Sequence, residues 1–446
     1  MISRDQFFDK ILPVCLVAFL LTTHLIVALG TELSHDEAYY WLYSKNLDWG
    51  YFDHPPMVAW LIKITSWLGG EIGVRLSFIL GLVGSGYLLQ TFIPNENRWI
   101  LWLGLNIFPL ISFSGVFALP DGALLIFSAL WIFALKLSLD HQGVRGALLV
   151  AVATACLFYS KYHGIFYVLA TIIAVPQILG RKYFWISALL ALALYSPHLY
   201  WQWSHDLATF RYHFLERPKI EMGFRQPTEF LAVNFILIGT LIAPYLWREF
   251  FRKVAQSSFE RSLKSMTIVI VGFFFYSTFS KKMEANWTVA AGLSLLVFIC
   301  LKPNNFKRNK IFQALASLSL LLVFTAKLGL VSPGLLPIKR IGEFHGWEKW
   351  AKGIEQNNKG CTIAANRYQY ASKLSFYLGK DVTALNVSSR KNQFDFWDRS
   401  YLKGQTLCWV AEQEIFPGET ILTPTGQKLT LVKGVPFELI MSYKGI

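Results

Sequence analysis

The sequence predicts an all-α polytopic membrane protein followed by a small C-terminal α/β domain outside the membrane. The chain has 446 residues, of which 54% are hydrophobic and only 16% are charged, whereas roughly a quarter are charged in an average soluble protein. The formal net charge is +14, but the basic residues form short clusters between long apolar runs. This pattern is typical of membrane proteins and argues against a nucleic-acid partner.

About eleven apolar runs are long enough to cross a bilayer, which takes about 20 residues of helix. The first run is interpreted as a retained helix, because the residues around Gly30 offer a poor signal-peptide cleavage site and further spans follow. The predicted spans lie near residues 11–30, 72–93, 99–117, 121–139, 146–160, 163–179, 184–200, 228–247, 265–280, 287–301 and 311–331.

The loops differ in their content of basic residues. Arg and Lys are denser in the alternate set of loops that starts with the N-terminal tail than in the loops on the other side. The positive-inside rule therefore predicts a cytoplasmic N-terminus and places everything after Val331 outside. We expect a transmembrane domain over residues 1–331 and an extracytoplasmic domain over 332–446.

The C-terminal 115 residues change in pattern. One helical stretch, Tyr368–Leu378, stands among short β-like stretches, namely Cys361–Ala365, Val382–Asn386, Thr406–Val410, Lys428–Val432 and Phe437–Met441. Cys361 and Cys408 both fall in this region, which the topology puts in an oxidising location. A disulfide between them stays open, because sequence does not show how close their Cα atoms come.

Acids and histidines gather in the loops of one side. Under the predicted topology these are the outer loops, so we expect a polar chamber at the outer ends of the helices. The first candidates are Asp36 and Glu37, directly after the first span. A carboxylate at the membrane edge beside aromatic rings suits a general base. The alternative is a helix N-cap at Ser34 with acids favoured by the helix dipole. One or two juxtamembrane helices are expected within residues 36–68.

Two further acids come with prolines. Asp53 and His54 precede Pro55 and Pro56, which stiffen the backbone and present both side chains on an extended turn. Asp121 follows a proline at the start of an apolar span. The alternatives are a simple loop breaker at the first position and a helix cap at the second.

Lysines lie in two other outer loops. Lys161 and His163 follow one span, and Lys281, Lys282 and Glu284 precede another. Such cations suit a lipid-linked phosphate. A lysine that snorkels to the headgroups, or a solvated loop, is the alternative. The acids and histidines include acceptable metal ligands, but no metal-binding spacing is present, so no metal site is assigned and a divalent cation stays open.

These motifs together resemble bacterial glycosyltransferases of the GT-C superfamily. The resemblance rests on Asp36-Glu37, on residues 51–56 (YFDHPP), on Pro120-Asp121, on residues 160–164 (SKYHG) and on residues 284–287 (EANW). The most similar groups are the protein-mannosyltransferase-like families, including the lipid A aminoarabinose transferases (families 39 and 83). The resemblance covers most of residues 30–300.

The resemblance implies an inner-membrane enzyme that takes a sugar from a polyprenyl phosphate and transfers it, with inversion, to an envelope glycolipid of the lipid A type. It implies that Asp36, Glu37 and Asp121 are catalytic. The donor would be held by Asp53, His54, Lys161, His163, Lys281, Lys282 and Glu284. The aminoarabinose transferases usually have Glu-Lys-Pro-Pro where this chain has Asp53-His54-Pro55-Pro56, which shifts the expected phosphate contact toward Lys161.

Other functions remain open at this stage. The acceptor is either a glycolipid or a protein Ser/Thr, and the sugar is not specified. A lipid or sugar transporter would need ionisable residues near mid-membrane, whereas Arg75, Lys136 and Lys327 fall near the ends of predicted spans. A membrane-anchored assembly protein would not need acids in three loops on one face.

Overall fold

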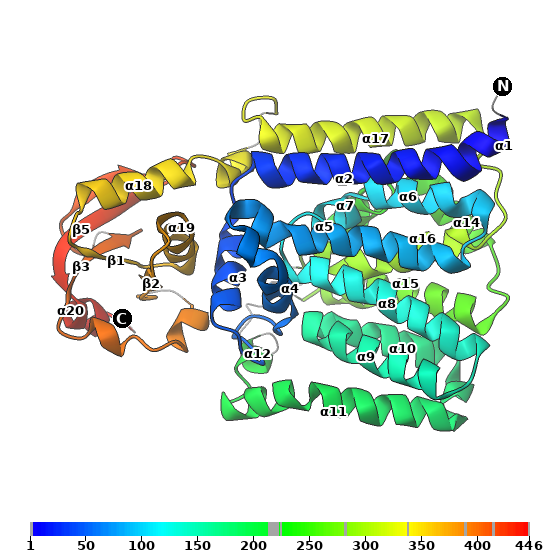
Figure 1. Cartoon of the computed structure of the whole chain (residues 1–446), viewed down its shortest axis with the longest axis horizontal. Helices are drawn as coiled ribbons and strands as arrows, with labels where there is room; N and C mark the ends of the chain where they lie inside the picture. Colours follow the sequence, from blue (N-terminus) through cyan, green and yellow to red (C-terminus); the bar gives the residue numbers. More distant parts are fainter. Residues whose placement is uncertain are drawn as a thin grey trace.

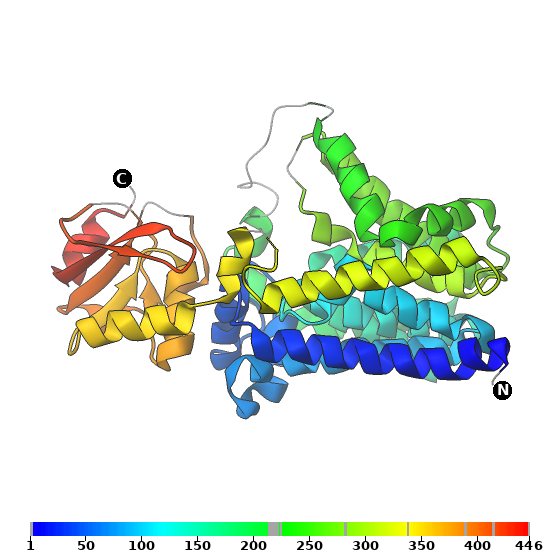
Figure 2. The same ribbon diagram turned by 90° about the horizontal axis from the view of Figure 1, so that it is seen from above.

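A computed structural model describes residues 3–212, 223, 225–280, 283–336, 339–387, 390–412 and 415–444. It shows a long helical bundle with a small sheet-containing domain at one end (Figure 1). The N-terminus lies at the opposite end of the bundle from this domain, as both views show (Figures 1 and 2).

The bundle is built from helices of unequal length. In chain order they are α1 (Arg4–Gln6), α2 (Leu12–Gly30), α3 (His35–Lys45), α4 (Met57–Thr65), α5 (Gly70–Leu89), α6 (Arg98–Ile107), α7 (Pro109–Ser114), α8 (Pro120–Asp140), α9 (Val144–Ser160), α10 (Ile165–Ala174), α11 (Lys182–Ser204), α12 (Ala208–Arg211), α13 (Arg225–Leu237), α14 (Ala243–Arg252), α15 (Ser258–Ser277), α16 (Val289–Cys300) and α17 (Lys310–Val331). Short 3-10 turns include η5 (Tyr162–Gly164), η8 (Thr240–Ile242), η9 (Ala285–Thr288) and η10 (Lys339–Phe344).

Within the described residues, four helices are long and apolar enough to cross a membrane. They cover Arg4–Gly30, Gly70–Phe92, Pro120–Asp140 and Lys310–Val331, and a fifth span results if the pair Arg225–Leu237 and Thr240–Arg252, bent by 109°, counts as one. Eleven spans are therefore not confirmed. One reason is that predicted runs break: the run 99–117 divides at Pro109, which begins α7.

The predicted juxtamembrane region forms α3 and α4. Both helices lie at the end of the bundle, between it and the C-terminal domain (Figure 1). Ser34 begins α3 as a capping box: its hydroxyl accepts from the Glu37 N–H, and the Glu37 carboxylate accepts from the Ser34 N–H. Two reciprocal bonds satisfy donors that a helix start leaves unpaired.

The outer domain, residues 347–444, contains one five-stranded sheet and three helices, α18 (Trp347–Asn357), α19 (Tyr368–Leu378) and α20 (Phe437–Ser442). Strand order is β2 (Thr383–Ala384), β1 (Thr362–Ala365), β3 (Thr406–Ala411), β5 (Lys428–Pro436) and β4 (Glu419–Leu422). β1 runs parallel to β2 and β3, and β5 runs antiparallel to β3 and β4.

Most predicted elements of this domain are confirmed, and one is wrong. The helix Tyr368–Leu378 has the predicted bounds, but Phe437–Met441 is helix α20 and not a strand. Pro436 at the end of β5 explains the error, because proline has no N–H to continue a strand ladder. Cys361 and Cys408 form a disulfide, with their Cα atoms 5.8 Å apart, which settles the pairing that the sequence left open.

Candidate active site

A cavity of about 310 Å³ lies where the bundle meets the outer domain. Six of the ten predicted site residues line it, and they come from four separate loops of the chain: Asp36, Asp53, His54, Asp121, Lys161 and Glu284. The outer domain closes the cavity with Tyr368 and Arg390. The expected polar chamber is therefore present at this end of the helices.

Asp36 stands in the first turn of α3 and is open to this cavity. The Tyr368 hydroxyl donates a hydrogen bond to its Oδ1 at 3.2 Å. The surrounding protein displaces water from the Asp36 carboxylate, and this desolvation raises its pKa. Repulsion from the nearby Glu343 carboxylate raises the pKa further, from 3.8 to about 6 in all. A carboxylate with a pKa near neutrality suits proton abstraction.

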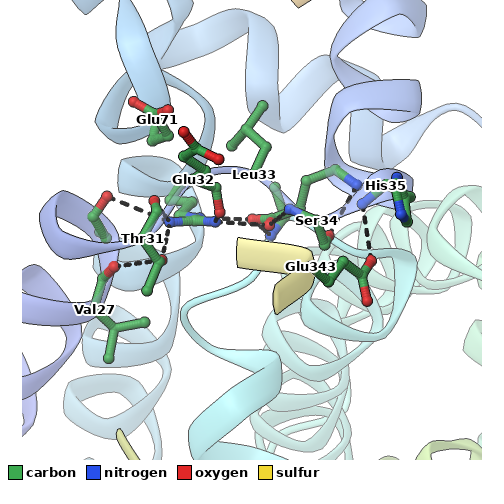
Figure 3. Close-up of polar contacts among 12 residues, drawn as sticks. Val27, Thr31, Glu32, Leu33, Ser34, His35, Glu71 and Glu343 are labelled. Atoms are coloured by element: carbon green, nitrogen blue, oxygen red, sulfur yellow. Dashed lines mark hydrogen bonds and ion pairs between the residues drawn. The ribbon is translucent and has the colours of Figure 1, made fainter. Parts of the chain in front are cut away.

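Glu37, one residue later, has a different environment. Its carboxylate is fully buried and forms a two-pronged ion pair with Arg75 of α5, at 2.7 and 2.8 Å. Burial opposes this charge, but the Arg75 guanidinium holds the pKa of Glu37 below its usual value. Arg75 also donates to the carbonyl oxygens of Thr31 and Glu32, and Glu343 accepts a hydrogen bond from the backbone N–H of His35. Figure 3 shows Thr31, Glu32, His35 and Glu343 in this region.

Glu37 therefore lies outside the cavity. The capping box corresponds to the helix-cap alternative for this residue. The ion pair with Arg75 is a further structural role that the sequence did not indicate. The N–H of Ala118 also donates to the Glu37 carboxylate at 3.1 Å, so one buried acid joins α3, α5 and the loop before α8.

Asp121 is the second residue of α8, directly after Pro120, and is buried. Lys161, the residue that follows α9, donates to its Oδ1 at 2.8 Å, and Asn286 of η9 donates to its Oδ2 at 2.8 Å. The Lys161 ammonium also lies 5.9 Å from the centre of the Trp287 ring. Three loops are thus joined at one carboxylate.

Asp53 also lines the cavity and is buried. Its Oδ2 accepts hydrogen bonds from the hydroxyls of Tyr39 at 2.8 Å and Tyr43 at 3.2 Å. Its Oδ1 pairs with Arg390 of the outer domain at 2.8 Å. This ion pair connects the first outer loop to a residue 337 positions further along the chain.

The remaining predicted residues fall in three classes. His54 and Glu284 line the cavity, and the His54 ring lies 5.8 Å from that of Tyr40. His163 is not among the lining residues; its ring lies 5.0 Å from that of Trp287 and 4.8 Å from that of Phe274. Lys281 and Lys282 lie outside the described residues.

Several cavity residues were not predicted as site residues. Tyr39, Tyr40, Asn286 and Trp287 sit within or beside motifs that the sequence singled out. Arg390 stands in a loop after β2 with no motif around it, so sequence alone gave no signal for it. Its position in the cavity depends on how the outer domain docks.

The arrangement supports acid–base and phosphate chemistry. It offers one carboxylate with a pKa near neutrality, two ion-paired cations and a rim of tyrosine and tryptophan rings. In the described part of the chain, no three His, Cys, Asp or Glu residues are grouped as they would be to hold a metal ion.

The chain is similar in sequence to one described family and to one curated relative. Residues 53–201 match the family described as dolichyl-phosphate-mannose-protein mannosyltransferase. The lipid A galacturonosyltransferase RgtD of Rhizobium johnstonii is 28% identical over 314 residues, which is 65% of this chain. The match spans 65% of the length of that relative.

The fold is similar to that of solved ArnT structures from Cupriavidus metallidurans. The apo form superposes with a TM-score of 0.68 at 15% identity and covers 97% of this chain and 98% of its own. The form bound to undecaprenyl phosphate superposes with a TM-score of 0.66 at 14% identity, over 95% and 98% of the two chains. This chain therefore shares the fold of the ArnT structures. The predicted resemblance to this group of glycosyltransferases agrees with the three matches.

Proposed function

We propose that this chain is an inverting glycosyltransferase that moves a sugar from a polyprenyl-phosphate donor to a lipid A-type glycolipid at the outer face of the inner membrane. The observation that carries the proposal is Asp36, a carboxylate with a pKa near neutrality that opens into a cavity flanked by Lys161 and Arg390. The similarity to RgtD and to ArnT supports the same class of enzyme.

A lipid-linked donor fits both the chemistry and the position of the site. A sugar phosphodiester is already activated, so no nucleotide is required. The cavity is lined by residues of both the bundle and the outer domain. A polyprenyl chain could therefore stay in the membrane beside the bundle while its phosphate reaches the polar residues. The fold neighbour crystallised with undecaprenyl phosphate is consistent with this donor class.

The transfer step balances without an external reagent. An acceptor hydroxyl attacks the anomeric carbon, its oxygen forms the new glycosidic bond, and Asp36 takes its proton. The bond between the anomeric carbon and the phosphate oxygen breaks, and the electron pair leaves with the polyprenyl phosphate. Fixed cations stabilise the negative charge that grows on this leaving group. Two cations are held at the cavity by acids, Lys161 by Asp121 and Arg390 by Asp53. If the acceptor is itself a phosphate, no base is needed and Asp36 orients it.

The acceptor assignment rests on the named relative. RgtD acts on lipid A by name, which favours a glycolipid. The family matched by residues 53–201 is named for transfer to protein, so transfer to Ser/Thr is the alternative acceptor. The named relatives differ in their sugars and do not specify one for this chain.

The test is mass spectrometry of envelope glycolipids from cells that carry the wild-type gene, no gene, or the Asp36→Asn variant. We expect one sugar residue to be missing from lipid A or its core without the gene, and Asp36→Asn to reproduce this loss. Loss of a general base typically slows transfer by about 10²- to 10⁴-fold. Asp381→Asn, which changes an exposed acid of the outer domain, is the matched control.

Other outcomes redirect the proposal. A sugar missing from glycoproteins would assign a protein acceptor. Unchanged glycolipids and glycoproteins would contradict a transferase and favour a lipid or sugar transporter. Normal transfer by a correctly inserted Asp36→Asn protein would remove Asp36 from the mechanism.

A further inference from the structure

Building on the proposed function, we propose that Arg390 of the outer domain binds the phosphate of the lipid-linked donor, and that Asp53 is its positioning residue. The bundle would then supply the base, while the outer domain supplies a cation for the leaving group. The argument rests on how the guanidinium is held and on which of its edges is open.

The guanidinium of Arg390 is fixed at the cavity wall from three sides. Its centre lies 4.9 Å from the Tyr212 ring and 5.7 Å from the Tyr368 ring. Asp53 holds one N–H group at 2.8 Å. Stacking uses the faces of a guanidinium and leaves its edges to donate hydrogen bonds.

Arg390 keeps donors for a ligand. A guanidinium carries five N–H donors, and among the described residues only one of them has a hydrogen-bond partner, Asp53. The Arg390 side chain is 43% exposed. An open edge with two parallel N–H groups matches two oxygens of a phosphate.

Lys161, the second described cation at the cavity, is held more tightly. Its side chain is only 7% exposed and its ammonium is bonded to Asp121. Four carboxylates and two described cations line the cavity, so the number of charges does not by itself favour an anion. A phosphate binds where N–H donors are accessible, and the Arg390 side chain is more exposed than that of Lys161.

Asp53 is preorganised to place Arg390. Its side chain is 7% exposed, and the hydroxyls of Tyr39 and Tyr43 hold the oxygen that does not contact the arginine. Asp53 therefore cannot turn away without losing these bonds. The arginine is already oriented before a ligand arrives, which lowers the entropic cost of binding.

The experiment measures binding of undecaprenyl phosphate to the purified full-length protein in nanodiscs. We expect Arg390→Gln to bind about 10- to 100-fold more weakly, the effect of losing a charge-assisted bidentate contact. Arg390→Lys should recover part of this loss, since lysine keeps the charge but not the fork. Lys433→Gln, which removes an exposed cation from β5, should bind as the wild type does.

A second probe separates phosphate recognition from domain docking. Undecaprenol has the same chain without the phosphate, and its binding should be equal in wild type and Arg390→Gln. Equal weakening of both lipids would show that Arg390 only shapes the site, and would overturn the inference. Unchanged binding of undecaprenyl phosphate by Arg390→Gln would overturn it too while leaving the donor class intact. Failure of the wild type to bind undecaprenyl phosphate would instead contradict the proposed donor.

Discussion

Two adjacent acids, Asp36 and Glu37, show how position in a helical turn separates chemistry from structure. Both stand in the first turn of α3, yet Asp36 opens to the cavity while Glu37 is buried against Arg75. Neighbours in a helix point about 100° apart, so one faces the outer domain and the other faces the bundle. The sequence places both in one motif and does not tell them apart.

The pH dependence of transfer should follow Asp36. Its pKa of about 6 means that the carboxylate form is lost as the pH falls through 6. We therefore expect the rate to be constant above about pH 7 and to fall tenfold per unit well below pH 6. Glu343→Gln removes a nearby negative charge, so its profile should shift to lower pH. A pH–rate profile of both proteins checks this; superimposed profiles would exclude Glu343 as a cause.

Arg75→Met should unfold more readily than the wild type. The variant leaves the Glu37 carboxylate buried without its cation, an imbalance that typically costs about 3 to 5 kcal/mol. Thermal unfolding in detergent measures this loss. Asp36→Asn is the matched comparison and should unfold close to the wild type, because Asp36 has no ion pair among the described contacts. Equal stability of Arg75→Met and the wild type would contradict the role of the pair.

At the scale of elements, the start of α8 depends on a glycine after Asp121. A Cβ on Gly122 would lie 2.4 Å from the Ser114 carbonyl oxygen and 2.8 Å from a ring carbon of Phe78. The backbone of α8 therefore approaches the preceding loop more closely than any side chain allows.

Gly122→Ala should weaken both stability and transfer, although alanine normally favours a helix by about 1 kcal/mol over glycine. The clash must move the start of α8 and with it the carboxylate that holds Lys161. Thermal unfolding and transfer assays test this together. Gly84→Ala is the control: Gly84 lies in the middle of α5 and a Cβ there would meet no atom within 4 Å, so this variant should be neutral or stabilising. A stabilised, active Gly122→Ala would show that the loop adapts freely.

Local pattern predicted some elements well and others poorly. The helix Tyr368–Leu378 and strands β1 and β3 were predicted from periodicity and β-branched content. In these segments the packed structure has the same secondary structure that the local sequence favours. Apolar runs, by contrast, predict helices but not where they break. The 109° bend between Arg225–Leu237 and Thr240–Arg252 falls at Gly239 and Thr240, which both have positive φ, inside a run that the sequence analysis treated as one span.

At the scale of the molecule, residues 31–35 connect the bundle to the outer domain. The Glu32 carboxylate accepts from the N–H groups of Trp347 at 2.6 Å and Glu348 at 3.1 Å, and so caps α18 from across the junction. Lys373 of α19 donates to the carbonyls of Leu33 and Glu343. Asp36 follows directly, so the docking contacts and the candidate base share one segment.

Glu32→Ala should loosen this docking. Removing a carboxylate from a helix start costs about 0.5 to 2 kcal/mol, and we expect faster hydrogen exchange at Trp347 and Glu348 with a several-fold slower transfer. Glu32→Gln retains one carbonyl acceptor and should be affected less. Exchange rates that match the wild type in Glu32→Ala would show that this cap does not hold the domain.

Sequence reasoning predicted the part of the candidate site that the bundle supplies but not the part that the outer domain supplies. Residues of the outer loops were predicted because topology places all these loops on one side. Arg390 was not, since its approach to Asp53 depends on how two parts of the chain pack, 337 positions apart. An ion pair between residues so far apart in the chain leaves no pattern in the sequence around either residue.

The bond between Cys361 and Cys408 encloses both outer-domain residues of the cavity, Tyr368 and Arg390, in a single covalent ring. A reducing buffer, or synthesis without an oxidant, opens this ring and leaves the bundle untouched. We expect protein prepared that way to insert normally but to bind undecaprenyl phosphate more weakly. Reoxidation should restore this binding, and binding that is equal in the reduced and oxidised protein would show that the ring is not needed to place Arg390.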